Sequence, residues 1–423
     1  MITSKTRGRA TPRPTRSAYT TFHQLVQYIP HGLIDKIANE EGADIRKFSA
    51  TSHFMALLFG QLTSAPSLND ICDALRLHEP ELKRIRGATA PKRNTFSNAN
   101  RRRDPIIAER MYWALFDHLR TLAPGFTQCK KHSGFLHRVK RDIFAIDSTT
   151  LQLTLNSIDW AKHRRKKAAA KTHMRLNIGN MLPVYVVIEE ASHHDVTRAE
   201  ALCAGLEAGN VLLADRAYLD YGLLNSLSKR EVIFVMREKK NLRFKVISER
   251  KHENPNIVSD QTVVPEDEKT AEKYTGTLRR VTAIVQVNRQ DCEMTFITNH
   301  LTWSPWTIAE LYRARWAIEL FFKEIKQTLQ LSDFVGYNEN AVKWQVWVAL
   351  IAHLLLRFMK HISKWGLSFS RLCGITRAAI WMKNNFIEIL NLYGTADGPK
   401  RPTVVGEQLY FQGFHHFSSD PMG

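Results

Sequence analysis

The segment from Thr307 to Leu331 constrains this chain more than any other part of its sequence. It contains no glycine or proline and consists mostly of good helix formers, so it predicts one long amphipathic helix. Ser304 or Thr307 is the expected N-cap, with Pro305 in the first turn. At 3.6 residues per turn, one polar face carries Tyr312, Arg315, Glu319 and Lys326. An apolar stripe that should pack on a core contains Leu311, Ile318, Phe322, Ile325 and Leu329.

One carboxylate in a row with two cations and a phenol has two interpretations. The more common meaning of an i, i+4 Arg–Glu pair is a solvent-exposed helix face. The alternative is a metal ion held beside a phosphate. Two upstream aspartates favour the second interpretation: Asp147 ends the apolar segment Arg141–Asp147, and Asp215 ends the apolar segment Val211–Asp215.

Both apolar segments are predicted to be strands. If these strands are parallel neighbours, the two aspartates lie side by side at one sheet edge, where the long helix can bring Glu319 to them. Three carboxylates repel one another unless a cation neutralises them, and hard oxygen ligands select Mg²⁺, with Mn²⁺ as a substitute. We therefore expect Asp147, Asp215 and Glu319 to be catalytic metal ligands. Two ions about 3.5–4 Å apart would support in-line displacement at phosphorus. Tyr312, Arg315 and Lys326 would donate to the phosphates.

The charge balance points to an anionic partner. The chain has 60 Lys and Arg against 41 Asp and Glu, a formal net charge of +19, which most often indicates nucleic acid. Residues 1–20 form a basic arm whose composition predicts disorder, although an organellar transit peptide has a similar composition. The basic stretch 162–175 is expected to hold DNA, with a solvated loop as the alternative. The expected DNA-contacting cations are Lys162, Arg164, Arg165, Lys166, Lys167, Lys171 and Arg216.

The pattern over residues 21–132 is helical. The expected helices are Phe22–Ile29, His31–Glu41, Thr51–Leu62, Ser67–Leu75 and Asp104–Leu122. Ser67 and Asp70 form a capping motif. A basic, asparagine-rich segment between the last two helices is typical either of a DNA-end recognition domain or of a solvated loop in an accessory domain. No helix-turn-helix spacing identifies a recognition helix.

Over residues 133–395 the pattern predicts a mixture of strands and helices. Thr150–Leu155 and Leu182–Ile188 are expected strands, and Val196–Leu206 an expected helix. Hairpin strands, a helix, a strand and then helices are the order of a ribonuclease-H-like α/β fold. Further strands at 232–236, 243–247, 279–287 and 293–298 predict a β-rich insertion over residues 230–300. Helices over 344–362 and 369–393 close the core, and residues 396–423 form a polar tail.

The cysteines and the hydropathy of the chain indicate the cellular compartment of the protein. Five scattered cysteines without zinc-ligand spacing predict reduced thiols and a cytoplasmic protein, which would be associated with the nucleoid if it binds DNA. The most apolar run, Trp344–Leu356, is too short to span a bilayer and predicts a core helix. His193 and His194 could be metal ligands or a general base, but such a pair more often bonds backbone or caps a helix, and Asp195 is the expected cap.

The pattern Tyr312-x2-Arg315-x3-Glu319-x6-Lys326, with Asp147 in IDSTT and Asp215 in ADRAY, resembles the DDE transposases of bacterial insertion sequences, in the family typified by insertion sequence four. The resemblance implies cut-and-paste transposition: end nicking, hairpin formation, hairpin opening and strand transfer. It also implies binding to terminal inverted repeats and to target DNA, and an active homodimer. Ser148 departs from the glycine of many relatives, and no stacking role is assigned to Trp303 or Trp306.

Two other functions stay open at this point. A structure-selective nuclease or resolvase would share the three acids but not the strand-transfer step. A DNA-binding regulator that has lost catalysis would also explain the charge, but the presence of all three acids and their helper residues argues against it.

Overall fold

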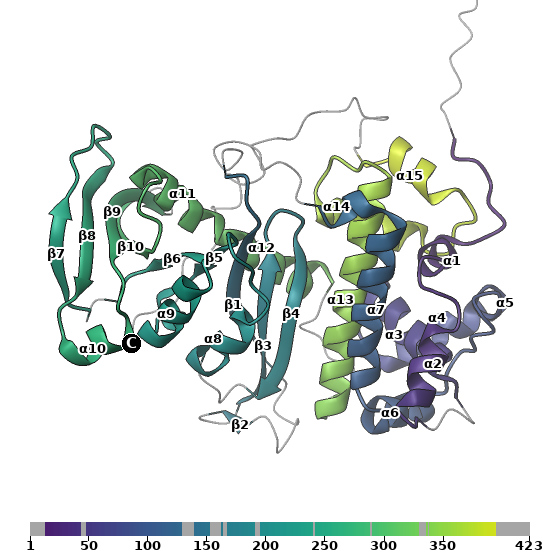
Figure 1. Ribbon diagram of the computed structural model, residues 1–423. Coiled ribbons are helices and arrows are strands. Elements are labelled where there is room, and N and C mark those ends of the chain that lie inside the picture. The colour runs from purple at the N-terminus through teal and green to yellow at the C-terminus, as the bar shows by residue number, and fades with distance from the viewer. Residues whose placement is uncertain are drawn as a thin grey trace, which may run out of the picture. The chain divides into compact units, whose positions relative to one another are not determined.

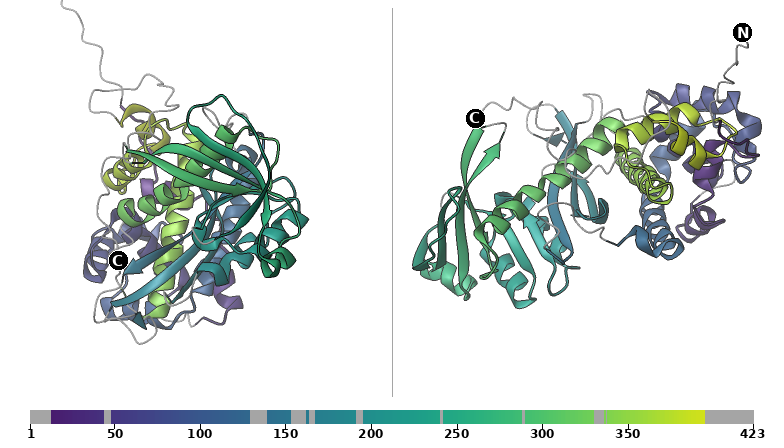
Figure 2. Two further views of the ribbon diagram at one scale, coloured as in Figure 1. Left: turned by 90° about the vertical axis from the view of Figure 1, so that its left-hand side faces the viewer. Right: turned by 90° about the horizontal axis from the view of Figure 1, so that it is seen from above.

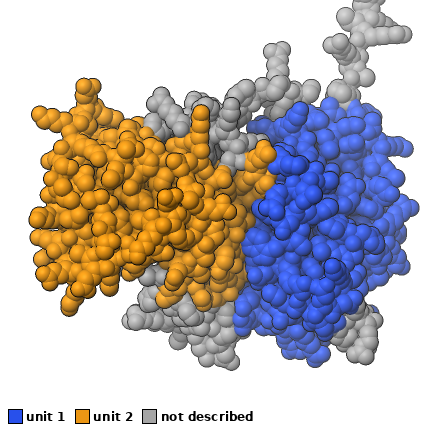
Figure 3. All heavy atoms as spheres, in the orientation of Figure 1, with its two compact units in different colours: residues 1–126, 324–404 blue, residues 127–323, 405–423 orange. Residues whose placement is uncertain are grey.

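The computed structural model describes residues 13–43, 48–128, 139–152, 162–163, 167–190, 195–239, 242–287, 290–329, 336 and 338–394. The chain forms two compact units (Figure 3). Unit 1 contains Met1–Phe126 and Glu324–Val404, and unit 2 contains Thr127–Lys323 and Val405–Gly423. These limits differ from the predicted ones, because the C-terminal helices pack with the N-terminal helices. The division into functional domains stays a prediction.

Helices are the main regular structure of unit 1 in its described residues, which also contain one isolated β-bridge between Arg16 and Asn384 (Figure 1). Its centre is α13 (Glu339–Ile362), which packs against α3, α6, α7 and α14. The other elements are α1 (Thr21–Val26), α2 (Leu33–Glu40), α3 (Ala50–Thr63), α4 (Leu68–Leu77), α5 (Glu79–Lys83), α6 (Arg93–Arg102), α7 (Ile106–Leu122), η1 (Pro124–Phe126), η4 (Glu324–Thr328), α14 (Phe369–Ala379) and α15 (Phe386–Leu392).

The expected helices before residue 363 are confirmed within a few residues, including the cap in which the Asp70 backbone N–H donates to Ser67 Oγ over 3.2 Å. The predicted helical segment 369–393 forms two separate helices, α14 and α15. Two helices were not predicted, α5 and, in the basic segment after it, α6. Among the described residues, α13 is the one helix long and apolar enough to cross a membrane. Its apolar side chains are buried inside unit 1, as predicted for a core helix.

A buried histidine makes the stability of unit 1 depend on pH. His53 of α3 is fully buried, and its Nε2 lies 2.7 Å from Asn100 Oδ1 of α6. Burial, with a smaller contribution from Arg103, lowers the pKa of His53 from 6.5 to about 3. Below the unfolded pKa, the unfolded state therefore binds more protons than the folded state. The stability contributed by neutral His53 is complete above about pH 6.5 and is lost as the pH falls towards 3.

We expect His53→Gln to reduce this acid sensitivity, because glutamine can still donate to Asn100 but does not titrate. The slope of unfolding free energy against pH should fall by up to about 1.4 kcal/mol per pH unit between about pH 6 and pH 4. Urea unfolding at several pH values measures it. The control is His31→Gln, at an exposed histidine of the same unit. Parallel pH profiles for His53→Gln and the unmodified protein would contradict the expectation.

Unit 2 is built on a mixed sheet with helices. Its strands follow the order β2-β3-β1-β5-β6-β10-β9-β8-β7, and β4 pairs with β3. β1, β5 and β6 are parallel to one another, and the other pairings are antiparallel. The strands are β1 (Ile143–Gln152), β2 (Lys162–His163), β3 (Lys167–Asn177), β4 (Leu182–Glu190), β5 (Val211–Ala214), β6 (Ile233–Arg237), β7 (Phe244–Glu249), β8 (Ile257–Pro265), β9 (Leu278–Val287) and β10 (Gln290–Thr298).

Helices cover both faces of this sheet. Ile146, Leu212 and Phe234 share a core with residues of α8 (Asp195–Cys203) and α9 (Tyr221–Lys229). Successive side chains of a strand point to opposite faces, so Asp147 lies on the face opposite Ile146. On that face α11 (Pro305–Ala314) and α12 (Trp316–Lys323) follow one another, with α11 against β5 and β6 and α12 against β1 (Figure 2).

Three details of the predicted strands are wrong. β1 continues through Asp147 to Gln152, so the predicted strand beginning at Thr150 is the second half of β1. β6 pairs with β5 in the central sheet, so the insertion cannot begin at residue 230. Five elements were not predicted: β2, β3, β8, α9 and the short helix α10 (Glu268–Lys273). β3 contains residues 167–175 of the basic stretch, which is therefore largely a strand of the sheet and not a solvated loop. These errors in strand assignment arise because strand ends and pairing depend on neighbours distant in sequence.

Candidate active site

The two aspartates occupy neighbouring parallel strands, as predicted. Ile146 of β1 pairs with Ala214 of β5, so Asp147 and Asp215 are the next residues along the two strands. Asp215 comes directly after β5, whereas Asp147 lies inside β1, and the backbone N–H of Ser148 donates to Asp147 Oδ1 over 2.8 Å. The parallel register therefore brings two carboxylates from distant parts of the chain to one place on the sheet.

The helical segment that carries the third carboxylate is interrupted. α11 is capped by Ser304, whose Oγ accepts from the Thr307 backbone N–H, and it ends at Ala314. Arg315 is its C-cap, α12 begins at Trp316, and the π-helix η4 follows. The expected single helix to Leu331 is therefore wrong in detail. The predicted apolar stripe, from Leu311 to Leu329, is buried as expected.

Side chains of this helical segment contact all three acids. The Tyr312 hydroxyl donates to Asp215 Oδ1 over 3.0 Å. Arg315 donates through Nη1 to Asp147 Oδ2 over 3.1 Å and through Nη2 to Glu319 Oε1 over 2.5 Å. The Arg315 guanidinium also lies over the Tyr312 ring, 5.6 Å from its centre. One guanidinium and one phenol thus connect two strand aspartates with the helix glutamate, all within unit 2.

The protonation behaviour of these groups reflects partial burial and mutual charge. Burial raises the pKa of Glu319, and the Asp147 and Asp215 carboxylates raise it further against the opposing effect of Arg315. Burial raises the pKa of Tyr312 to about 12, so its hydroxyl stays protonated and can donate. Burial disfavours the charged form of Arg315, but Tyr312 and the surrounding carboxylates raise its pKa overall. The site therefore concentrates negative charge around one fixed cation.

The donor set fits a hard divalent cation. It consists of carboxylate oxygens without histidine or cysteine, which is the chemistry that Mg²⁺ and Mn²⁺ select. Within the described parts of the chain, no three Asp, Glu, His or Cys side chains already form a metal-binding group. Arg315 instead provides the positive charge between Asp147 and Glu319. Metal binding would require these carboxylates to exchange contacts with Arg315 for contacts with the ion.

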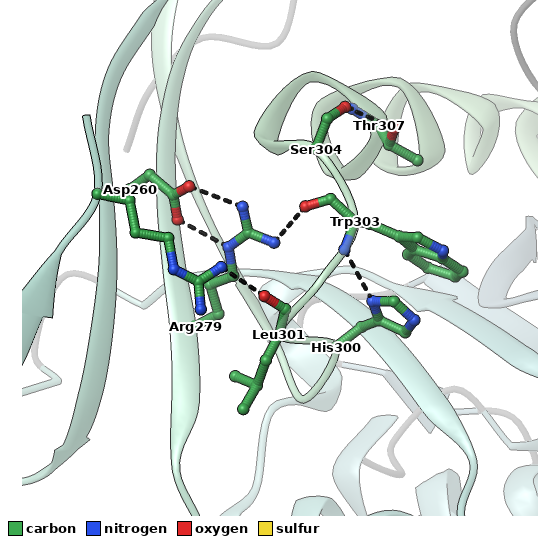
Figure 4. Close-up of polar contacts among 8 residues, drawn as sticks. Asp260, Arg279, His300, Leu301, Trp303, Ser304 and Thr307 are labelled. Atoms are coloured by element: carbon green, nitrogen blue, oxygen red, sulfur yellow. Dashed lines mark hydrogen bonds and ion pairs between the residues drawn. The ribbon is translucent and has the colours of Figure 1, made fainter. Parts of the chain in front are cut away.

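The connection between β10 and α11 is held by residues that the sequence analysis did not identify (Figure 4). Arg279 of β9 is 1% exposed and donates through Nε and Nη2 to both oxygens of Asp260, over 2.7 Å each. Arg279 Nη1 donates to the carbonyl of Trp303, and Arg250 donates to that of Leu301. A buried ion pair thereby fixes the loop just before the N-cap of α11.

An aromatic contact completes this connection. The Trp303 backbone N–H donates to His300 Nδ1 over 3.2 Å, and the two rings stack with centroids 3.8 Å apart. Nothing in the sequence distinguishes Asp260 or Arg279 from ordinary polar strand residues, because their pairing depends on the register of β8 and β9. These residues position the helical segment that carries Tyr312, Arg315 and Glu319.

The remaining predicted contacts have mixed outcomes. Arg216 is exposed in the short 3-10 helix Arg216–Tyr218, directly after Asp215, and Lys171 is half-buried on β3. Lys326 lies in η4 of unit 1, where burial lowers its pKa. Lys162 and Lys167 lie on β2 and β3, but their side chains are outside the described residues. Residues 164–166 (Arg164, Arg165, Lys166) and residues 193–194 (His193, His194) lie outside them entirely.

Comparison with known families agrees with this arrangement. A model of the transposase DDE domain matches residues 138–355, which is more than half of the chain and includes all three acids. The chain belongs to the DDE transposase family. A second family model, a domain of unknown function (DUF4372), matches residues 17–85.

Individual relatives of this DDE transposase come from several bacteria. The chain is 30% identical over 243 residues to a probable transposase for insertion sequence element IS5377 of Geobacillus stearothermophilus, covering 57% of this chain and 62% of the relative. It is 28% identical to the putative transposase y4zB of Sinorhizobium fredii, covering 63% and 74%. It is also 28% identical to the transposase InsG for insertion sequence element IS4 of Escherichia coli, covering 42% of each. The chain thus spans about three-fifths of the Geobacillus relative.

Proposed function

We propose that this chain is a DNA transposase that moves an insertion sequence by cut-and-paste transposition. The observation that carries the proposal is the connection of Asp147, Asp215 and Glu319 through Arg315 and Tyr312 of one helical segment. The sheet order β4-β3-β1-β5-β6, with parallel β1, β5 and β6, supports a ribonuclease-H-like core. On this assignment β7 to β10 form an insertion between that core and the helical segment bearing Glu319.

Asp147, Asp215 and Glu319 would hold Mg²⁺ or Mn²⁺. Two bound ions would activate the attacking oxygen and stabilise the leaving oxygen in each phosphoryl substitution. Tyr312 and Arg315 would then turn from the carboxylates to the phosphates, since both are strong donors. The same side chains can serve end nicking, hairpin formation, hairpin opening and strand transfer, because each is a substitution at phosphorus.

The proposed partners follow from the chemistry. The substrates are the element's terminal inverted repeats and target DNA, which fits the formal charge of +19. Pairing of two DNA ends requires two active sites, so we propose a homodimer in the active complex. A DNA substrate would place the enzyme in the cytoplasm, at the nucleoid.

The deciding experiment is a strand-transfer assay with a linear donor that carries the element's ends, a target plasmid and Mg²⁺. A transposase yields hairpin intermediates and a covalently joined donor–target product. A structure-selective nuclease yields cleavage without joining, which would overturn the proposal in favour of that second function. Metal-dependent nicking of either kind would exclude a regulator without catalysis.

Replacement of Arg315 tests its role as the cation between the acids. Arg315→Met leaves Asp147 and Glu319 without their shared partner, so the melting temperature should fall in metal-free buffer. A divalent ion can replace the lost charge, so Mg²⁺ should raise the melting temperature of this variant more than that of the unmodified protein. Differential scanning fluorimetry with EDTA or Mg²⁺ measures both effects.

The matched control is Arg313→Met. Arg313 lies two positions away and forms an ion pair with Glu310, and its side chain is 47% exposed. We expect Mg²⁺ to have no extra effect on this control. Equal responses of the two variants to Mg²⁺ would show that Arg315 does not stand in for a metal ion.

A further inference from the structure

Helix α6 of unit 1 presents one fully polar face to solvent. Its residues 93, 97 and 101 form one row along the helix, and residues 94, 98 and 102 form the adjacent row. All six side chains are exposed, and the opposite face buries Phe96, Ala99 and Asn100. The exposed side chains are Arg93, Asn94, Ser97, Asn98, Arg101 and Arg102. Arginine and asparagine are the side chains that most often form bidentate hydrogen bonds with guanine and adenine, respectively.

Among the described residues, Arg93, Arg101 and Arg102 form no ion pair with an acidic side chain. Residues 84–103 contain no Asp or Glu. The side chains of Arg93 and Arg101 donate hydrogen bonds to Asn94 Oδ1 and Asn98 Oδ1, over 3.5 and 3.3 Å. The first acid after the helix, Asp104, accepts from the Ile106 backbone N–H at the start of α7. An exposed arginine face whose cations are not paired with described acids is complementary to a polyanion.

Contacts of its buried face and of its C-terminal end fix α6 within unit 1. Phe96 packs edge-to-face on His53, and Asn100 Oδ1 bonds His53 Nε2. At the C-terminal end, Asn338 and Asn340 donate to the carbonyl of Arg101 over 3.1 and 3.0 Å. Figure 1 shows α6 beside the N-terminal end of α13. Contacts that fix the helix axis without using the outer face are what a helix inserted into the major groove requires.

We propose that α6 is the base-reading helix of this protein, with Asn94 and Asn98 contacting base edges and Arg93, Arg101 and Arg102 contacting bases or phosphates in the major groove of duplex DNA. The inference rests on the proposed function, because it names the element that recognises the DNA ends. It lies outside the match to the domain of unknown function, which ends at residue 85.

The test is a binding selection with the full-length protein in EDTA, so that no cleavage intervenes. The probe is a pool of short duplexes with a randomised centre. We expect the unmodified protein to enrich one sequence. Asn94→Ala and Asn98→Ala should each lower the affinity for that sequence by roughly five- to a hundredfold and leave the affinity for unselected duplex unchanged. Arg101→Gln and Arg102→Gln should weaken binding to both and lower the salt dependence.

The matched controls are Asn39→Ala and Lys36→Gln, at exposed positions of α2 in the same unit, which should change neither affinity. The inference would be overturned if Asn94→Ala and Asn98→Ala enriched the same DNA sequence as the unmodified protein and bound it with unchanged affinity. It would also be overturned if the unmodified protein enriched no DNA sequence. A strand-transfer assay with the same preparations separates this inference from the proposed transposase function. If the protein still joins donor to target DNA while the α6 variants select DNA as the unmodified protein does, only the role of α6 is wrong.

Discussion

Asp215→Asn is expected to abolish DNA strand cleavage in Mg²⁺ while leaving the fold and DNA binding intact. Asparagine still offers an oxygen to the Tyr312 hydroxyl, so the contact over 3.0 Å can be kept while the negative charge is lost. A metal ligand contributes several kcal/mol of transition-state stabilisation, which corresponds to a rate loss on the order of a thousandfold or more. Asp147→Asn and Glu319→Gln should have the same effect, for the same reason.

Nicking and hairpin formation on a linear donor measure the loss, with a band-shift assay for binding. The control is Glu293→Gln, an exposed carboxylate on β10 of the same unit, which should retain full activity. Hairpin formation at the unmodified rate by any of the three active-site variants would remove that residue from the catalytic machinery.

Arg279→Met is expected to cause a large loss of stability in unit 2. It leaves Asp260, whose side chain is 3% exposed, as a buried unpaired charge, and it frees the Trp303 carbonyl. Breaking a buried ion pair from one side typically costs about 3–5 kcal/mol. Because the same guanidinium fixes the start of α11, the cleavage rate should also fall even in protein that remains folded.

Urea unfolding measures this stability, and a double-mutant cycle isolates the ion pair. Arg279→Met with Asp260→Leu should recover much of the stability, since no buried charge is then left unpaired. The neighbouring Arg280→Met is the control. Arg280 pairs with Glu238 and is 32% exposed, so its loss should cost about 1 kcal/mol or less. Equal costs for Arg279→Met and Arg280→Met would contradict the positioning role.

Local patterns were sufficient to predict much of the candidate site. Strand-forming residues before Asp147 and Asp215, and helix-forming residues around Glu319, predicted elements that the structure contains. The parallel pairing of β1 with β5 was also predicted, because two apolar strands that end near acids fit adjacent parallel positions.

Long-range geometry was not predictable in the same way. The break at Arg315 and the contacts of Arg315 with Asp147 depend on how the helical segment meets the sheet. The Asp260–Arg279 pair depends on strand register, and α6 is stabilised by tertiary contacts such as that of Asn100 with His53. Weak intrinsic helix propensity in an asparagine-rich segment was overridden by packing.

The central claim is that Asp147, Asp215 and Glu319 form one divalent-metal site. Anomalous diffraction from crystals of the full chain soaked in Mn²⁺ tests it most directly. We predict an anomalous peak within bonding distance of carboxylate oxygens from all three residues, with Arg315 withdrawn from at least one of them. Mn²⁺ bound only by other residues, with the three carboxylates still paired with Arg315 and Tyr312, would contradict it.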